Sequence, residues 1–428
     1  MNITFIGAGY VGLVSATMLS HLGHNVMCCD NNKDKILGLQ RGEVPIYEPE
    51  LDRYIEDCVA AGRLQFSSSS PRADDVTVVF IAVGTPPLES GSADLSYVED
   101  TVMQVAKSSS PNTLIVIKST VPPGTCLKLQ AMLRNHNLGH EVVSNPEFLR
   151  EGSAIEDFLN PDRIVLGTSS KRAEELLMKV YATFASYKSI LLCTDPTTSE
   201  LIKYASNSFL ATKIGFINEM ANLCERVGAD IDTLSKGMGM DKRIGSAFLK
   251  AGPGFGGSCF PKDLLALSHL ASQYNQPCHI LDSVIFSNKD RPAHMVGKIS
   301  NVMGDLRSKT ICALGITFKA ETDDVRSSPA VDIISLLIER GATVRVYDPA
   351  GAKNGALLAP NADFCRDAYE AASEADAIVI LTEWNEFKDL DFKKLMSIMA
   401  GRDLFDFRNI LNGKSIGEIG FHYHKVGK

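Results

Sequence analysis

The sequence predicts an α/β protein in which two Rossmann-like domains, each with a doubly wound parallel sheet, are joined by a long central helix and a helical middle domain. Short β-rich runs alternate with helical segments at both ends of the chain, and between them about thirty residues carry apolar side chains at helical spacing. The expected domains are residues 1–195, 196–300 and 301–428.

The elements follow from hydrophobic periodicity. The middle domain begins with residues 197–229, where apolar residues recur at i, i+3, i+4 and i+7 without a proline, so one long helix is expected. A second helical stretch covers residues 279–304. Apolar, β-branched runs predict strands within residues 3–12, 25–30, 76–85, 113–120, 141–144, 163–168, 309–318, 342–348, 375–382 and 402–407.

Composition limits the class of protein. A chain of 428 residues exceeds one hydrophobic core, and no run of about 18 apolar residues predicts a membrane span. The net charge of −8 argues against the basic stripe of a nucleic-acid-binding protein. Because no basic segment precedes the apolar start, we expect no signal peptide and a cytoplasmic location.

The cysteines are expected to stay reduced, since no export signal precedes the chain. Cys28, Cys29, Cys193 and Cys312 lie in apolar, strand-like runs and are expected to be small buried side chains. No CxxC pair occurs, so we expect no metal site. Cys259 differs, because it lies in the glycine-rich stretch GPGFGGSCFPKD.

A dinucleotide-binding turn is predicted at the start of the chain. Gly7, Gly9 and Gly12 form the pattern G-x-G-x-x-G directly after the first strand, where glycines allow a tight turn, close approach to a pyrophosphate and helix–strand packing. The next strand ends in Asp30, whose carboxylate suits the hydroxyls of an unphosphorylated ribose. The pattern therefore predicts NAD rather than NADP. Lys35 fits either a cofactor contact or a solvated helix position.

Polar residues also follow three later strands. Thr85 and Thr120 lie where ligands bind in a doubly wound sheet, although threonine also favours turns. Glu147 and Glu151 are four residues apart. If that segment is helical, the two carboxylates share one face and one of them could acquire a raised pKa suited to acid–base chemistry. A solvated helix end is the alternative.

Two further patterns concern the middle of the chain. Lys203 and Asn207 are one helical turn apart among apolar neighbours, so they form an oxyanion clamp or, alternatively, the lysine extends to solvent. Cys259 precedes a predicted helix start with Lys262 nearby, and both features favour a thiolate. Asp263 is a helix-start residue, a base or an orienting group. A nucleophile and a packed thiol both remain open for Cys259.

Several long motifs, in order and over almost the whole chain, resemble the bacterial UDP-glucose 6-dehydrogenase family. They are GAGYVG, NPEFLREG, the Lys203–Asn207 helix, RIGSAFLKAGPGFGGSCFPKD and GITFKAETDDVRSSP. The resemblance implies an NAD domain, a long helix that forms a homodimer and a C-terminal domain that holds the uridine nucleotide. It also implies four-electron oxidation of UDP-glucose at C6 to UDP-glucuronate, with two NAD reduced.

This chemistry explains why a cysteine is needed. Oxidation of an alcohol needs a base and a nicotinamide, but oxidation of the aldehyde needs a new hydride donor. Addition of a thiolate gives a thiohemiacetal, which loses hydride to become a thioester that water hydrolyses. The resemblance implies Cys259 as nucleophile, Lys203 with Asn207 as oxyanion stabilisers, Asp263 as the group that orients water and Lys203, and Glu147, Glu151 and Thr120 around the nicotinamide and the hydrolytic water. Which of these residues acts as base stays open.

The remaining contacts are also expected from the resemblance, in which Arg243 reaches the partner subunit's site. The cofactor contacts are Gly7, Gly9, Tyr10, Val11, Gly12, Asp30, Lys35, Thr85, Thr120, Glu151, Lys262 and Arg326. The nucleotide-sugar contacts are Glu147, Phe148, Leu149, Arg150, Glu151, Lys203, Asn207, Arg243, Phe248, Leu249, Lys250, Ala251, Gly252, Gly256 and Lys319.

Two alternatives are weighed against this function. A dehydrogenase for GDP-mannose or a UDP-N-acetylhexosamine is less favoured, because RIGSAFLKAG resembles the UDP-glucose enzymes. A non-catalytic NAD-binding regulator would leave the Cys, Lys, Asn and Asp set without a purpose. The tail from Gly413 onward is expected to have solvated histidines.

Overall fold

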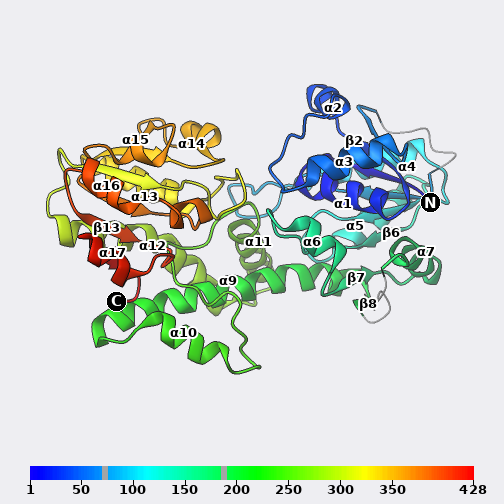
Figure 1. The fold of residues 1–428 in the computed structure, drawn as a ribbon. Helices are drawn as coiled ribbons and strands as arrows, with labels where there is room; N and C mark the ends of the chain where they lie inside the picture. Colours follow the sequence, from blue (N-terminus) through cyan, green and yellow to red (C-terminus); the bar gives the residue numbers. More distant parts are fainter. Residues whose placement is uncertain (70–75, 185–189) are drawn as a thin grey trace. The chain divides into compact units, whose positions relative to one another are not determined.

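The computed structural model describes residues 1–69, 76–184 and 190–428. The chain divides into two compact units, Met1–Ser206 and Asn207–Lys428. Helix α9 (Pro196–Val227) begins in the first unit and ends in the second (Figure 1). The three domains predicted from the sequence, with boundaries at 195 and 300, stay a prediction.

The first unit is built on a mostly parallel sheet in the order β3-β2-β1-β4-β5-β6-β7-β8. Its first six strands have the doubly wound order 3-2-1-4-5-6. Strand β7 pairs with β6 antiparallel and with β8 parallel. The strands are β1 (Asn2–Ile6), β2 (Asn25–Cys29), β3 (Leu64–Ser67), β4 (Val78–Ile81), β5 (Leu114–Ile117), β6 (Val142–Ser144), β7 (Ile164–Gly167) and β8 (Leu191–Thr194).

Helices cover both faces of this sheet, which explains why the central strands β4 and β5 are apolar at every position. Successive residues of a strand point to opposite faces. On β4, Val78 and Phe80 therefore pack with α1 and α3, whereas Val79 and Ile81 pack with α4 and α5. The helices are α1 (Tyr10–His21), α2 (Lys33–Gln40), α3 (Leu51–Ala60), α4 (Ser96–Ser108), α5 (Thr125–Asn135), α6 (Ala154–Leu159) and α7 (Lys171–Tyr181).

The second unit repeats the same strand order. Its parallel sheet runs β11-β10-β9-β12-β13-β14, which is again 3-2-1-4-5-6 when counted from its first strand. The strands are β9 (Thr310–Leu314), β10 (Thr343–Tyr347), β11 (Asp363–Phe364), β12 (Ala377–Ile380), β13 (Asp403–Asp406) and β14 (His422–Lys425). The predicted fold class, two Rossmann-like doubly wound domains joined by a long helix and a helical middle, is confirmed.

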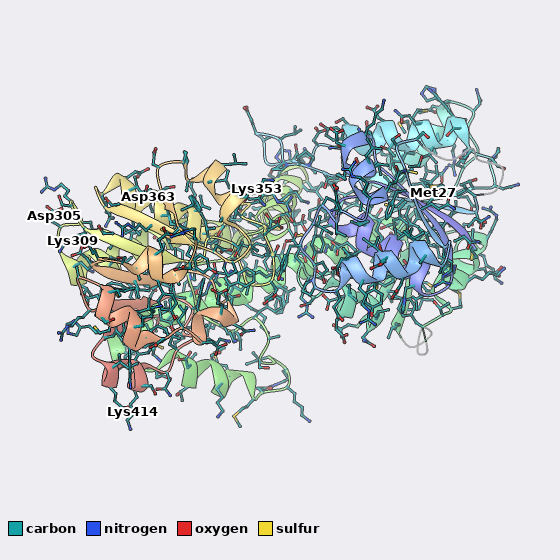
Figure 2. The ribbon with its side chains drawn as sticks, turned by 45° about the horizontal axis from the view of Figure 1, so that its top comes forward. Met27, Asp305, Lys309, Lys353, Asp363 and Lys414 are labelled. Atoms are coloured by element: carbon teal, nitrogen blue, oxygen red, sulfur yellow. The ribbon has the colours of Figure 1, made fainter. Side chains whose placement is uncertain are left out.

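Helices of the second unit precede and surround this sheet. They are α10 (Ile231–Gly239), α11 (Phe260–Gln273), α12 (His279–Met303), α13 (Pro329–Glu339), α14 (Ala352–Leu358), α15 (Ala368–Ala372), the 3₁₀ helix η1 (Asn385–Lys388), α16 (Phe392–Ile398) and α17 (Gly413–Ile419). Asp376 ties the starts of β9 and β12 together, since its carboxylate accepts hydrogen bonds from Lys309 Nζ (3.0 Å) and from the backbone N–H of Thr310 (2.8 Å). Figure 2 labels Lys309, directly before β9, and Asp363, the first residue of β11.

The long helix predicted at residues 197–229 is confirmed as α9. It begins where Asp195 Oδ1 accepts a hydrogen bond from the backbone N–H of Thr198 at 2.9 Å. It ends before Gly228, whose φ of 79° only glycine adopts readily. The apolar stripe includes Ala211 and Ile217, both fully buried, so packing as well as propensity stabilises the helix.

Two expectations are wrong at the sheet edges. Cys193 is exposed rather than buried, because β8 is an edge strand. The solvated position expected for the tail histidines is confirmed for His422, whose side chain is 68% exposed, and is wrong for His424, because β14 pairs with β13 and the His424 ring stacks on Phe405 with 4.6 Å between ring centres. His424 Nε2 also lies 2.9 Å from Asp403 Oδ1, so this histidine is a structural residue. Short, polar edge strands give too weak an alternation to be predicted, and β3 and β11 were missed for the same reason.

The first glycine turn allows a test of packing. A Cβ on Gly12 would lie 1.8 Å from the carbonyl oxygen of Gly7, whereas a Cβ on Gly9 meets no atom within 4 Å. Gly12→Ala is therefore expected to lower the free energy of unfolding by about 1–3 kcal/mol, the usual cost of overpacking. Gly9→Ala is the matched control: its Cβ meets no atom, so it should lower the free energy of unfolding by at most about 1 kcal/mol, the cost of replacing a glycine N-cap by alanine. Thermal denaturation of both variants checks this, and equal melting temperatures would contradict it.

Candidate active site

The turn after β1 has the geometry that a dinucleotide-binding loop needs. Gly7 has a φ of 105°, and a Cβ there would lie 2.5 Å from the carbonyl oxygen of Ala82. The backbone of Gly9 faces open space, and α1 begins at the next residue, Tyr10. A helix N-terminus beside an open glycine is a site where backbone amides can bind phosphate. Tyr10, Val11 and Gly12 form the first turn of this helix.

Asp30 lies beside this turn. Its Oδ2 accepts hydrogen bonds from the backbone N–H of Ala8 (2.9 Å) and from Lys35 Nζ (2.9 Å), and its Oδ1 accepts from the N–H of Asn32 (2.9 Å). Burial alone would raise the pKa of Asp30, but these donors lower it below its ordinary value. The structure thus brings the predicted Asp30 to the glycine turn, and Lys35 is bound to that carboxylate rather than extended into solvent.

The ends of β4 and β5 are joined by their threonines. Thr85 is buried and its hydroxyl donates to the carbonyl oxygen of Thr120 at 3.0 Å. Ser119 donates to the carbonyl oxygen of Val83 at 2.6 Å, which ties the same two turns a second time. Both predicted threonines therefore lie at the carboxyl edge of the sheet that also carries the glycine turn, as a doubly wound sheet requires.

The segment from Asn145 to Ser153 is not helical, so the expected common face for Glu147 and Glu151 is wrong. Helix α6 begins only at Ala154. The Asn145 side chain donates to the carbonyl oxygen of Val165 at 2.9 Å, which holds the start of the segment in an irregular path. Gly152 takes a φ of 75°, which interrupts any helix before Ala154. The glutamates are four residues apart along a loop.

Glu147 forms a buried ion pair with Lys203 of α9. Its Oε1 lies 2.9 Å from Lys203 Nζ, both side chains are 4% exposed, and its Oε2 accepts the N–H of Leu149 at 2.5 Å. Burial alone would raise the pKa of Glu147, but the ammonium of Lys203 and these hydrogen bonds lower it. The expectation of a raised pKa is therefore wrong for Glu147, which stays ionised as a hydrogen-bond acceptor. The predicted alternative that Lys203 extends to solvent is also wrong.

Lys118 was missed as a site residue. It follows the last residue of β5, is buried, and donates from Nζ to Asn145 Oδ1 at 3.3 Å. Burial lowers the pKa of Lys118 to about 8; Glu147 opposes this shift and Lys203 adds to it. The available sequence signal was a lysine directly after four apolar strand residues, in LIVIK, where a solvated turn was the simpler interpretation.

Glu48 was also missed, and it connects two predicted segments. Its Oε2 accepts hydrogen bonds from the hydroxyl of Tyr10 and from the backbone N–H of Gly152 (2.6 Å). Its Oε1 accepts from the N–H of Ala154 at 2.7 Å. Glu48 therefore fixes the loop that carries Glu151 against the first turn of α1. No local sequence pattern predicts this role of Glu48, since its hydrogen-bond partners are far away in the sequence.

In the second unit, Cys259 lies at the start of α11. It is half-buried and occupies the residue before the first helical position. Asp263, one turn into the helix, is 1% exposed. Its carboxylate accepts hydrogen bonds from Asn207 Nδ2 (2.6 Å) and Lys262 Nζ (2.6 Å). The structure thus brings together three of the predicted residues: Lys262 and Asp263 lie in the first turn of α11, directly after Cys259, and Asn207 of α9 donates to Asp263.

The glycine-rich loop before Cys259 is held by side chains that sequence reasoning did not single out. Asn218 Oδ1 accepts the N–H of Gly252 (2.8 Å), and Arg291 Nε donates to its carbonyl oxygen (2.9 Å). Asn288 accepts the N–H of Phe255 (2.8 Å) and donates to its carbonyl oxygen (3.0 Å). Each backbone group needs a partner because the loop is buried. The sequence signal that could have identified these three side chains was a polar residue among the apolar residues of a predicted helix.

Glycine is required at three positions of this loop, either by a positive φ or by a close contact with backbone. Gly254 and Gly257 take φ values of 128° and 82°. A Cβ on Gly256 would lie 2.3 Å from the carbonyl oxygen of Ser327. Before them, Phe248 adopts a positive φ of 64° and Lys250 is exposed, while Leu249, Ala251 and Gly252 are buried.

The remaining predicted contacts are placed differently. Arg243 is 89% exposed and paired with Asp241 at 2.6 Å, so it is not part of the Asp263 network. Arg326 pairs with Asp324 at 2.7 Å. Lys319 Nζ lies 5.7 Å from the centre of the Phe318 ring, beyond the carboxyl end of β9. Phe148 lies under the guanidinium of Arg163 at 3.8 Å, and Arg150 pairs with Asp157. Glu151 is half-buried in the turn before α6.

Two searches of the described part of the chain found nothing. No group of three His, Cys, Asp or Glu side chains among residues 1–69, 76–184 and 190–428 could hold a metal ion. Within the same residues, no helix is both long enough and apolar enough to cross a membrane.

Comparison with known proteins agrees with this geometry along the whole chain. Models of the UDP-glucose/GDP-mannose dehydrogenase family match residues 1–185 (NAD binding domain), 197–290 (central domain) and 312–413 (UDP binding domain). The UDP-glucose 6-dehydrogenase of Rickettsia felis is 50% identical over 431 residues, which cover 100% of this chain and 96% of that protein. That of Rhizobium meliloti is 48% identical over 435 residues, covering both chains completely.

Solved structures agree. A UDP-glucose dehydrogenase from Pyrobaculum islandicum has a TM-score of 0.91 at 38% identity, covering 99% of this chain and 96% of that chain. A UDP-D-ManNAc dehydrogenase from Pyrococcus horikoshii has a TM-score of 0.86 at 27% identity, covering 100% and 99%. With three matched domains and full-length relatives, the chain belongs to the UDP-glucose/GDP-mannose dehydrogenase family and carries that family's NAD binding domain at its N-terminus.

Proposed function

We propose that this protein oxidises UDP-glucose at C6 to UDP-glucuronate and transfers the four electrons to two molecules of NAD. Relatives about 50% identical over their full length carry the name UDP-glucose 6-dehydrogenase, which supports this substrate. The structural observation that carries the proposal is Cys259 at the start of α11, followed by the buried carboxylate of Asp263. A simple alcohol dehydrogenase has no use for such a thiol.

In the first oxidation, NAD would be held by the glycine turn, with the amides at the start of α1 available to its pyrophosphate and Asp30 to a ribose. The lowered pKa of Asp30 keeps the carboxylate ionised, so it can accept hydrogen bonds from ribose hydroxyls. The bound cofactor would supply the acceptor for the hydride of C6, while a base of this chain takes the hydroxyl proton. Thr120 and Glu151 are proposed to lie near the nicotinamide, and the identity of the base stays open.

In the second oxidation, the Cys259 thiolate attacks the aldehyde carbon and forms a C–S bond. Lys203 and Asn207 stabilise the oxyanion, which becomes the thiohemiacetal hydroxyl. With a second NAD bound as hydride acceptor, the thiohemiacetal would lose hydride from C6 and the proton of its hydroxyl, and a thioester would remain. Water attacks the thioester, the C–S bond breaks, and carboxylate and thiol are released. Asp263, which accepts hydrogen bonds from Asn207 and Lys262, is proposed to orient that water.

We further propose a homodimer formed through α9. Four apolar side chains on this helix, Phe209 (67%), Phe216 (45%), Leu223 (51%) and Val227 (67%), are unusually exposed, and their spacing of seven, seven and four residues places them on one face. Such a stripe on a soluble protein is typical of a protein interface. The exposed Arg243 would then reach the partner subunit's nucleotide-sugar site.

The stoichiometry of the reaction tests the proposed function. Purified protein is expected to form two NADH for each UDP-glucose consumed, because the thiohemiacetal route completes both oxidations. A panel of UDP-glucose, GDP-mannose and UDP-N-acetylhexosamines, measured by NADH absorbance, identifies the sugar. A ratio of one would reject the thioester route, and faster turnover of another nucleotide sugar would reject the proposed substrate.

Substitution of the nucleophile tests the thiol. Cys259→Ser is expected to reduce acid formation by at least about 10³-fold, as removal of a nucleophile does in other covalent enzymes. Cys278→Ser is the matched control, because Cys278 is also half-buried at a helix start. In Glu151→Gln, slowed hydrolysis should let mass spectrometry detect a sugar adduct on residue 259. Wild-type turnover by Cys259→Ala would refute the role.

The proposed dimer interface can be tested by placing charged residues on the apolar stripe of α9. Phe216→Arg/Leu223→Arg is expected to be monomeric in sedimentation velocity, because two cations on the apolar stripe resist burial. If the partner subunit's Arg243 completes the site, this variant and Arg243→Ala should lose affinity for UDP-glucose equally while keeping affinity for NAD. Leu357→Arg is the control, because Leu357 is an exposed apolar residue on a different helix, α14. Unchanged sugar affinity in the monomer would exclude the cross-subunit contact.

A further inference from the structure

Lys118 is a buried cation with few hydrogen-bond partners to offset the cost of its burial. Its side chain is almost completely inaccessible, and its Nζ has one hydrogen bond among the described residues, 3.3 Å long, to Asn145 Oδ1. That oxygen already accepts the hydroxyl of Tyr181. Burial of an ammonium group with so few partners costs free energy, so a protein under selection for stability alone would place an apolar residue here.

Positive charges outnumber negative charges in the cluster around Lys118. The groups that face it are the carboxylate of Glu147, the ammonium of Lys203, and the amide of Asn145 with the Tyr181 hydroxyl. Lys203 and Lys118 are both cations, and Glu147 is the single carboxylate among these groups. The cluster therefore holds one more positive than negative charge when Lys118 is protonated. Such a surplus suits a site where negative charge develops on the substrate.

Lys118 also acts on the loop that carries Glu147. Asn145, its hydrogen-bond partner, donates from Nδ2 to the carbonyl oxygen of Val165 and from its backbone N–H to that of Ile117, both at 2.9 Å. Glu147 follows two residues later. The positive charge of Lys118 is one of the influences that lower the pKa of Glu147, after Lys203 and the hydrogen bonds of Lys203 and Leu149.

We propose that Lys118 is a positioning residue for the reaction: its buried ammonium anchors Asn145 at the start of the loop that carries Glu147, and it adds positive charge near the Glu147–Lys203 pair. This inference rests on the proposed function, since that function places Glu147 and Lys203 beside the reacting carbon. Lys118 itself need not touch the substrate.

A stability measurement separates this role from a structural one. Lys118→Met keeps most of the side-chain volume and removes the buried charge, so its melting temperature at pH 7 is expected to equal or exceed that of the wild type. The folded protein holds the Lys118 proton with a pKa of about 8, against an ordinary value of 10.5. Wild-type stability therefore rises with pH between these two values, and the advantage of the variant should shrink over the same interval.

The activity of Lys118→Met is expected to fall although its stability does not. In Lys118→Met, kcat is expected to fall roughly tenfold, because the loop that carries Glu147 loses the charge-assisted hydrogen bond to Asn145. The acid limb of the kcat–pH profile should move to higher pH, because Glu147 loses a neighbouring cation. Lys128→Met is the matched control: Lys128 is an exposed lysine of α5, paired with Glu99 at 2.7 Å, and its loss should change neither measurement.

The outcomes are distinct. A stable variant with reduced kcat and a shifted acid limb supports the positioning role. Wild-type kcat and an unshifted profile would overturn this inference alone, and so would a loss of melting temperature that parallels the loss of kcat. If the wild type forms NADH from no nucleotide sugar, the proposed function fails and this inference fails with it.

Discussion

Parallel pairing of strands is the constraint on which the rest of the structure depends. Because every strand of β1 to β6 runs the same way, each turn that follows a strand lies at the same edge of the sheet. The glycine turn after β1, Asp30 after β2, Thr85 after β4 and Thr120 after β5 therefore lie at one edge. These residues are far apart in the sequence, and only the sheet brings them together.

The second sheet repeats this plan with a different result. Gly315 after β9 takes a φ of 97°, as Gly7 takes 105° after β1. Asp348 follows β10 as Asp30 follows β2, but its Oδ2 accepts the N–H groups of Ile316 (2.8 Å) and Thr317 (3.1 Å) as well as the Thr317 hydroxyl. Asp348 is also 3% exposed. Its Oδ1 accepts the N–H groups of Ala350 (3.0 Å) and Gly351 (2.7 Å) as well, so both oxygens of Asp348 are used in holding the turns of the second unit.

The candidate site contains two clusters built around buried carboxylates. Glu147 with Lys203, and Asp263 with Asn207 and Lys262, are buried carboxylates that accept hydrogen bonds from strong donors. Such groups cost free energy to bury unless they are paired, and these donors supply the compensation. The pairs also hold their side chains in single orientations, which reduces the reorganisation needed when a substrate develops charge.

By itself the sequence determined the fold class, the long helix, the glycine turn with Asp30, and the position of Cys259 in a glycine-rich loop before a helix, because periodicity and glycine spacing are local properties of the chain. Only the tertiary structure decided that residues 145–153 form a loop, that Glu147 stays ionised beside Lys203, that Lys118 and Glu48 hold this loop in the first unit, and that Arg291 holds the glycine-rich loop in the second. Edge strands such as β14 were also decided there. The physical reason is that pairing, burial and pKa depend on partners distant in sequence, which no local pattern encodes.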